Sequence, residues 1–143
     1  MQQENKLPHK IVIDTNIWVS FLIGKNLSGL LDYILNEEVL VCVCDEQIEE
    51  LKATFAKPKL QKYFDIEQIT NFLNFINEYT ENVSLKTKTD ICRDKKDNFL
   101  VSLALDSQAE YLITGDNDLL ILNPIESTQV IKYTDFEKII FTF

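Results

Sequence analysis

The chain has 143 residues, 45% hydrophobic and 26% charged, with three glycines and three prolines. This composition excludes a disordered or collagen-like chain and predicts one globular domain over residues 1–143, with its core at about 10–136. The polar start of the chain and the absence of an apolar run of roughly 20 residues predict a cytoplasmic protein without a membrane span. A formal net charge of −9 argues against a basic nucleic-acid-binding surface. Acids that hold divalent cations also make a chain acidic, so phosphodiester chemistry is not excluded.

The first half of the chain alternates between strand and helix patterns. Continuous β-branched and apolar runs predict buried strands, and apolar residues recurring every three or four positions predict helices. Asp45 is expected to cap the helix that follows it, and Pro58 interrupts the chain after that helix. In chain order we expect a strand at 10–14, a helix at 17–35 broken at Gly24, a strand at 39–44, a helix over 45–55 and a helix at 66–79.

The second half continues the alternation after a weak strand candidate at 82–86 and a charged loop at 87–96. A largely buried helix is predicted to begin at Asp97. It is followed by a strand at 111–114, a strand at 129–133 and a short helix at 135–140. This order is typical of an α/β fold with a mostly parallel sheet and helices on both faces. Such folds carry their functional groups at the C-terminal ends of the strands.

Acidic residues occur at the positions that this architecture brings together. Asp14 ends the first strand and Asp116 follows a later one, while Asp97 and the pair Glu49–Glu50 lie near helix N-termini that open onto the same edge. An ionised carboxylate beside an apolar strand, as at Asp14, needs a cation or several hydrogen-bond donors. Oxygen ligands without a Cys or His cluster favour Mg²⁺ or Mn²⁺ over zinc.

Other catalytic equipment is missing from the sequence. His9 is the only histidine and has no nucleophile elbow to pair with, and the chain contains neither a P-loop nor a GxGxxG motif. A HAD-like phosphatase needs a second acid where Asn16 stands. A phosphotransfer receiver needs an acid pair before its acid-bearing strand and a late lysine, and neither feature is convincingly in place. Both classes are therefore disfavoured. The three cysteines predict buried reduced thiols, and Trp18 and Phe21 predict core packing over base stacking.

Four short motifs follow one another along the chain. They are Asp-Thr-Asn at 14–16, Ile-Glu-Glu-Leu at 48–51 leading to Lys-Pro-Lys-Leu at 57–60, Arg-Asp-Lys-Lys-Asp-Asn at 93–98 and Thr-Gly-Asp-Asn-Asp-Leu-Leu at 114–120. In this order they resemble the motifs of PIN domains, most closely the VapC-like branch of toxins from toxin–antitoxin pairs. The resemblance covers about residues 10–136. It implies a single three-layer α/β/α domain and a metal-dependent endoribonuclease that uses Mg²⁺ or Mn²⁺.

The resemblance also implies roles for individual residues. The catalytic, metal-binding acids would be Asp14, Glu50, Asp97 and Asp116. Positions that support them would be Asn16, Asp118, Asp94 and Glu49. Glu50 is preferred to Glu49 because it directly precedes Leu51, and Asp97 to Asp94 because it opens the buried helix, which leaves Asp94 to orient Arg93. Residues expected to contact RNA are Arg93, Lys95, Lys96, Lys57 and Lys59.

The expected partners are RNA, an antitoxin protein and a second copy of the chain in a homodimer. Surplus apolar residues in the helix at 66–79 would supply a surface for a dimer or an antitoxin. The alternative function is a PIN-like module with weak or no catalysis that acts by binding a protein partner or nucleic acid. Acids are present at all four positions, which favours an active enzyme over this binding module.

Overall fold

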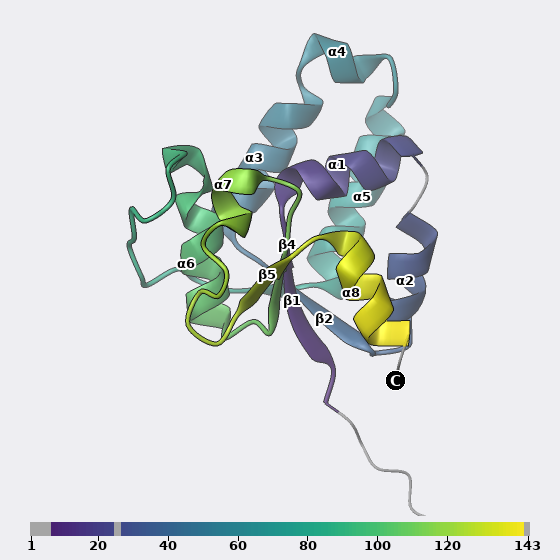
Figure 1. The fold of residues 1–143 in the computed structure, drawn as a ribbon. Coiled ribbons are helices and arrows are strands. Elements are labelled where there is room, and N and C mark those ends of the chain that lie inside the picture. The colour runs from purple at the N-terminus through teal and green to yellow at the C-terminus, as the bar shows by residue number, and fades with distance from the viewer. Residues whose placement is uncertain (1–6, 25–26, 142–143) are drawn as a thin grey trace, which may run out of the picture.

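The computed structural model describes residues 7–24 and 27–141, which form a five-stranded sheet in which all neighbouring strands are parallel (Figure 1). In the order β3-β2-β1-β4-β5, the strands are Glu81–Asn82, Val39–Val43, His9–Ile13, Tyr111–Ile113 and Gln129–Ile131. The chain winds from β1 outward to β2 and β3, then returns to β4 on the other side of β1. The edge between β1 and β4 is therefore the point where the winding reverses.

Helices cover both faces of the sheet, so the predicted three-layer α/β/α fold is confirmed (Figure 1). One face carries α1 (Thr15–Gly24), α2 (Leu27–Leu35), α3 (Asp45–Phe55), α4 (Pro58–Gln61), α5 (Ile66–Tyr79) and α8 (Tyr133–Phe141). The other carries α6 (Asn98–Ser107), which follows the 3-10 turn η1 (Lys95–Asp97), and α7 (Asn117–Leu120).

The alternation of side chains along each strand builds two separate cores. Ile11 and Ile13 of β1 pack with Trp18 of α1 in the larger core, whereas Val12 between them packs with Leu100 of α6 in the smaller one. Neighbouring residues of a strand point to opposite faces, so a continuous apolar run is what a sheet covered on both sides requires. This requirement is the reason why unbroken apolar runs in the sequence predict strands of this sheet.

Several further expectations are confirmed. Trp18 is fully buried and Phe21 nearly so, which places both in the core rather than on a base-stacking surface. Cys42, Cys44 and Cys92 are free and buried, and burial raises the pKa of the Cys42 and Cys44 thiols to about 11. No helix of the described residues is long and apolar enough to span a membrane.

The predicted strand at 82–86 is wrong beyond Asn82, where β3 ends. The amides of Lys86 and Thr87 donate hydrogen bonds to the Asp106 carboxylate, with N–O distances of 2.6 and 2.9 Å. A side chain of α6 thus takes the donors that a longer strand would have offered to the sheet. The segment leaves the sheet and becomes attached to α6.

Asp45 does not cap α3, contrary to the expectation from sequence. It is the first residue of the helix, Cys44 occupies the N-cap position, and the Asp45 carboxylate accepts a hydrogen bond from Asn82 at 3.0 Å. The acid joins the start of α3 to β3 instead of closing the helix end. Its position in the sequence fits both roles, and only the neighbouring strand decides between them.

The last strand and helix also shift relative to their predicted bounds. β5 ends at Ile131 instead of residue 133, and α8 begins at Tyr133 instead of residue 135. The amides of Asp135 and Phe136 both donate to the carbonyl of Lys132, which starts the helix directly after the strand. The apolar character of Tyr133 suits either element, so the sequence pattern alone placed the boundary too late.

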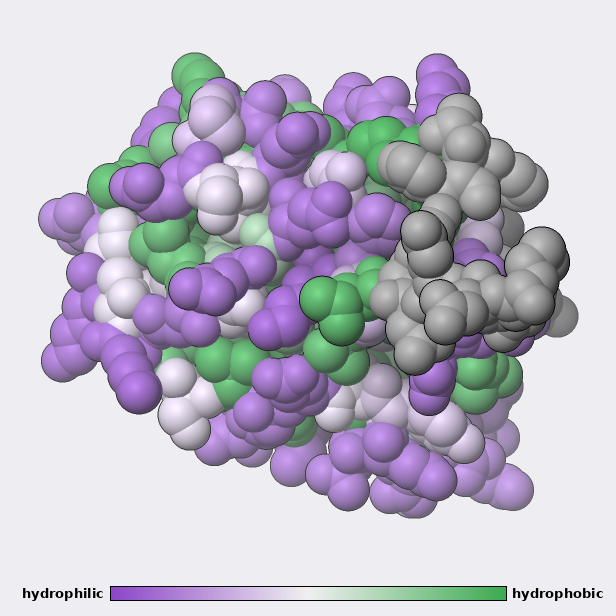
Figure 2. Space-filling model, turned by 90° about the horizontal axis from the view of Figure 1, so that it is seen from below, coloured by the Kyte–Doolittle hydropathy of each residue, from purple (hydrophilic) through white to green (hydrophobic). Residues whose placement is uncertain are grey.

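Figure 2 views the molecule from below, toward the N-terminal ends of the strands. The visible face is mainly hydrophilic, with hydrophobic residues in small separate areas. A cavity of about 780 Å³ near the start of β2 is lined partly by Glu37, Glu78 and Glu81. This end of the molecule lies opposite to the strand ends where the acids of the sequence motifs gather.

We expect Asp106→Asn to lower the free energy of unfolding at neutral pH by roughly 1 kcal/mol, because hydrogen bonds to a partly exposed carboxylate are lost. Burial raises the pKa of Asp106, but hydrogen bonds from the Thr87 hydroxyl and from the amides of Thr87 and Lys86 outweigh it and hold that pKa below its usual range. A lowered pKa stabilises the folded state above about pH 4, and this contribution disappears as the pH falls through the folded-state pKa.

Urea unfolding from neutral to strongly acidic pH measures this difference. The two proteins should converge in stability at the acidic end of the range. Asp90→Asn is the matched control, since Asp90 is an exposed acid of the same segment that makes no hydrogen bond within the described part of the chain. A loss as large in Asp90→Asn as in Asp106→Asn would contradict the role of Asp106.

Candidate acidic site

Asp14 directly follows β1 and is buried, with 3% of its surface exposed. Its Oδ2 accepts a hydrogen bond from the Thr114 hydroxyl at 2.7 Å, and its Oδ1 accepts one from the Asn16 amide at 3.1 Å. Burial raises the pKa of Asp14, these two hydrogen bonds oppose that effect, and the negative charge of Asp116 adds to it. The carboxylate is thus held in one orientation next to the core and faces another acid.

Thr114 connects the two acids at the reversal point of the sheet. It follows β4, is fully buried, and its hydroxyl oxygen also accepts the Asp116 amide at 3.0 Å while donating to Asp14. Asp116 in turn caps α7 by accepting the Asp118 amide at 2.9 Å. One buried hydroxyl therefore fixes the position of Asp116 relative to Asp14.

Asp97 joins this pair from the start of α6. Burial raises the pKa of Asp97 to about 7, with further contributions from a hydrogen bond to the Asp116 carboxyl and from the charges of Asp14, Asp116 and Asp94. Burial and neighbouring negative charge both favour the protonated form of a carboxyl group. Asp14, Asp97 and Asp116 therefore lie close enough for their charges to affect one another.

Glu50 reaches the same site from α3 and is half-buried. Burial raises the pKa of Glu50, the nearby Thr15 hydroxyl lowers it, and the charge of Asp14 raises it again. Lys57 lowers the pKa and Asp94 raises it, which places both side chains near Glu50. The charge of Asp14 thus acts on both Glu50 and Asp97, and the charge of Asp116 acts on Asp14 and Asp97.

Glu49 lies on the exposed surface of α3 instead. Its carboxylate pairs with Lys52 one turn later at 3.5 Å, and 73% of its side chain is exposed. The spacing of apolar residues along the helix did not distinguish Glu49 from Glu50. Their different burial in the fold does.

Arg93 is paired with Asp118, not with Asp94 as expected from the sequence. Its Nε lies 3.6 Å from Asp118 Oδ1, whereas Asp94 caps η1 by accepting the Lys96 amide at 3.1 Å. The Asp94 side chain is thereby committed to its own turn. Asp94 stays close enough to raise the pKa of Asp97 and Glu50 but is itself exposed.

The lysines expected to contact nucleic acid are exposed on two segments that flank the acids. One segment joins α3 to α4, and the other is η1, directly before Asp97. These lysines are Lys57, Lys59, Lys95 and Lys96. The charge of Lys57 lowers the pKa of Glu50.

Two buried polar residues of the site were not singled out from the sequence. Thr114 appeared only as part of a motif, although a hydroxyl at the end of an apolar strand, two residues before an acid, is a usable signal. Gln47 of α3 is fully buried, and its Nε2 donates to the carbonyl of Ile13 at 2.5 Å. This bond fixes α3 against the residue that precedes Asp14. Nothing in the sequence distinguished Gln47 from the exposed polar residues of that helix.

The donor chemistry of the site fits a hard divalent cation. All four groups are carboxylates, and the pKa values of Asp14, Glu50 and Asp97 are each raised by the charge of another acid. Mg²⁺ and Mn²⁺ prefer such oxygen ligands, and bound charge relieves their repulsion. In the part of the chain that the structure describes, no three His, Cys, Asp or Glu side chains are arranged as they stand to hold one ion.

The sheet is parallel and covered by helices on both faces, and Thr114 joins Asp14 and Asp116 at the ends of β1 and β4. These features define an α/β/α domain with acids at the reversal point of its sheet. The chain belongs to the PIN domain family, whose family model matches residues 10–118. PIN domains are typically nucleases. A relative, the uncharacterized protein MJ1680 of Methanocaldococcus jannaschii, is 34% identical over 125 residues, which cover 85% of this chain and 80% of that protein.

Two solved structures share the fold. The protein PAE2754 from Pyrobaculum aerophilum has a TM-score of 0.59 at 13% identity, with 96% of this chain and 97% of that chain covered. The PIN domain endonuclease Utp24 has a TM-score of 0.51 at 20% identity, with 79% and 75% covered. Both comparisons agree with the three-layer architecture described above.

We expect Asp116→Asn to raise the free energy of unfolding of the metal-free protein at pH 8 by roughly 0.5–1 kcal/mol, because it removes a repulsive charge that solvent only partly screens. Asparagine can still cap α7. The raised pKa of Asp97 stabilises the folded state at acidic pH, and this contribution is lost as the pH rises through about 7. The gain from the substitution should therefore be largest above pH 7.

Urea unfolding in EDTA at several pH values measures the gain. Glu49→Gln is the matched control, because it removes an acid from the same edge of the fold that is exposed and paired with Lys52. No gain is expected for that control. A loss of stability in Asp116→Asn above pH 7 would show that repulsion among the acids is not the dominant effect.

Proposed function

We propose that this protein is a metal-dependent endoribonuclease that hydrolyses phosphodiester bonds with Mg²⁺ or Mn²⁺. The observation that carries the proposal is the buried Asp14 carboxylate, which Thr114 connects to Asp116 at the strand ends of a PIN domain. The metal-binding acids would be Asp14, Glu50, Asp97 and Asp116. The nuclease character of the family, and an endonuclease among the proteins of similar fold, support the same reaction class.

The protein groups contribute orientation and charge. Two hydrogen bonds hold the Asp14 carboxylate so that it need not reorganise on binding. Asn16 and Asp118 act through their backbone amides, which fix Asp14 and Asp116. A divalent cation held by the acids would supply an activated water molecule for attack on phosphorus and charge to stabilise the leaving oxygen.

The exposed cations around the acids would bind the RNA backbone. They are Arg93, Lys95, Lys96, Lys57 and Lys59. Phosphate contacts of this kind position a nucleic acid without reading its sequence, and they weaken as salt increases. In an acidic chain they confine nucleic-acid binding to the rim of the site. The motif resemblance further supports the role of a cytoplasmic toxin held in check by an antitoxin protein.

We expect Asp14→Asn to reduce cleavage of a mixed-sequence RNA at least about 100-fold in Mg²⁺ or Mn²⁺, since metal-bound charge contributes several kcal/mol to the transition state. Glu50→Gln should have a similar effect, and Glu49→Gln should cleave at nearly the wild-type rate. Thermal-shift titrations with MgCl₂ and MnCl₂ report metal binding separately, so that wild type is stabilised and Asp14→Asn is not.

Cleavage by Asp14→Asn at the wild-type rate would refute the assignment of the site. Wild type without metal stabilisation and without cleavage would favour a binding module over an enzyme. The toxin role is tested by expression in growing cells, where arrest by wild type but not by Asp14→Asn is expected. Arrest by both variants would separate toxicity from cleavage.

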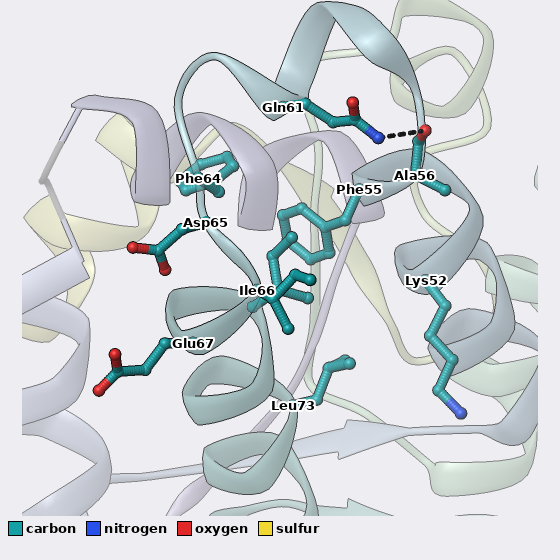
Figure 3. A pocket seen from close by; sticks show the side chains of 10 residues that line it. Lys52, Phe55, Ala56, Gln61, Phe64, Asp65, Ile66, Glu67 and Leu73 are labelled. Carbon is teal, nitrogen blue, oxygen red and sulfur yellow. Dashed lines mark hydrogen bonds between the residues drawn. The ribbon is translucent and has the colours of Figure 1, made fainter.

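Partner binding is a second function, favoured by an apolar cavity of about 820 Å³ between α3, α4 and α5 (Figure 3). Phe55 lies at its centre, with Lys52 on one side and Asp65 and Glu67 on the other. Ile66 beside it is 83% exposed. In a two-fold dimer Lys52 of one copy would face the acids of the other, so the two surfaces would be complementary. We therefore propose a second copy as the occupant.

Ile66→Asp should weaken this dimer at least about tenfold, because the substitution places a charge in an apolar contact. Size-exclusion chromatography with light scattering should show a dimer for wild type and a monomer for the variant at the same concentration. Ile121→Asp is the matched control, since Ile121, directly after α7, is 82% exposed. A monomeric wild type at high concentration, or equal weakening by both variants, would contradict this interface.

A further inference from the structure

Arg93 is the only arginine in the chain, and its side chain is 88% exposed. The contact with Asp118, 3.6 Å from Nε to Oδ1, is the one ion pair of its side chain within residues 7–24 and 27–141. An exposed ion pair of this length is weak and exchanges readily. The recorded contact runs through Nε, and the planar guanidinium carries five N–H donors in a fork that matches a phosphate.

The backbone that carries Arg93 is nevertheless fixed on both sides. The preceding Cys92 is buried, its amide donates to the Asn98 side chain at 2.9 Å, and its sulfur lies 3.8 Å from the carbonyl of Asp118. The following Asp94 caps η1. Arg93 therefore extends an exposed side chain from an anchored position.

Asp118 places the guanidinium at the rim of the acidic site. The amide of Asp118 is bonded to Asp116, so its backbone belongs to the site, but its carboxylate is directed to Arg93. A nucleic acid bound at the proposed nuclease site would bring backbone phosphates to this rim. A phosphate and the Asp118 carboxylate would then compete for the Arg93 guanidinium.

We propose that the Asp118 carboxylate pairs with Arg93 in the free protein. On binding, a backbone phosphate of single-stranded nucleic acid displaces this carboxylate and binds the guanidinium. The role of Asp118 is then that of a positioning residue for Arg93 and not that of a metal ligand. The location of the phosphate rests on the proposed nuclease function. The exchange itself is a binding event and can be tested without cleavage.

The test is fluorescence anisotropy with a labelled single-stranded oligoribonucleotide at low salt, first in EDTA and then with CaCl₂. Arg93→Ala should bind about three- to tenfold more weakly, with a salt dependence reduced by about one phosphate contact. Arg93→Lys should fall between Arg93→Ala and wild type, because it keeps the charge without the fork. Asp118→Asn should bind about two- to fivefold more tightly than wild type.

A double-mutant cycle separates exchange from the general effect of removing an acid. Asp118→Asn in the Arg93→Ala background should tighten binding much less than in wild type, because no arginine remains to be released. A DNA oligonucleotide of the same sequence should show the same pattern, since both polymers share the phosphate. Equal tightening in both backgrounds would overturn the proposal, as would a pattern confined to RNA.

Other outcomes distinguish this proposal from the proposed function. No binding by wild type and Asp118→Asn in either buffer would overturn the exchange, whatever the cleavage assay shows. The expected binding pattern together with no cleavage in Mg²⁺ or Mn²⁺ would support the exchange and refute the nuclease. Loss of metal stabilisation in Asp118→Asn, measured by thermal shift, would make Asp118 a metal ligand and overturn its role as the partner of Arg93.

Discussion

The hydrogen bond between the buried Thr114 hydroxyl and Asp14 is the interaction on which the site depends. It joins groups 100 residues apart in the chain at the ends of two adjacent parallel strands. A carboxylate buried to this extent is stable only with donors that satisfy it, and Thr114 and Asn16 supply them. Since Thr114 also accepts the Asp116 amide, the same hydroxyl determines where α7 begins.

The topology explains why the remaining acids gather there. Parallel strands place all their C-terminal ends at one edge, and helices that start at this edge bring their first turns to it. Asp97 opens α6 and Glu50 lies in the second turn of α3, so neither acid needs an irregular backbone to reach Asp14. Gathering acids has a cost in burial and repulsion: burial first, and then the neighbouring acids, raise the pKa of Asp97 to about 7.

The sequence predicted the architecture because strands and helices follow from local patterns. Apolar runs define strands buried on two sides, and an acid at the end of such a run is conspicuous. Features that depend on neighbours in space were missed or misassigned. Asp45 looked like a helix cap but bonds β3, and Arg93 was assigned to the adjacent Asp94 although it pairs with Asp118. The burial of Gln47 and the exposure of Glu49 likewise follow from how α3 lies on the sheet.

The positions of the basic side chains change what the net charge of −9 implies for nucleic-acid binding. The acids form the centre of the site, and exposed basic residues border it on two sides, with Lys57 near Glu50 and Arg93 beside Asp118. Long-range repulsion keeps polyanions from most of the surface, while a cation bound at the centre would reverse the field at that one place. Acidity then favours nucleic-acid binding at the site over nonspecific coating of the protein. For a nuclease that arrangement is selective, because a phosphate held elsewhere is not close to the acids.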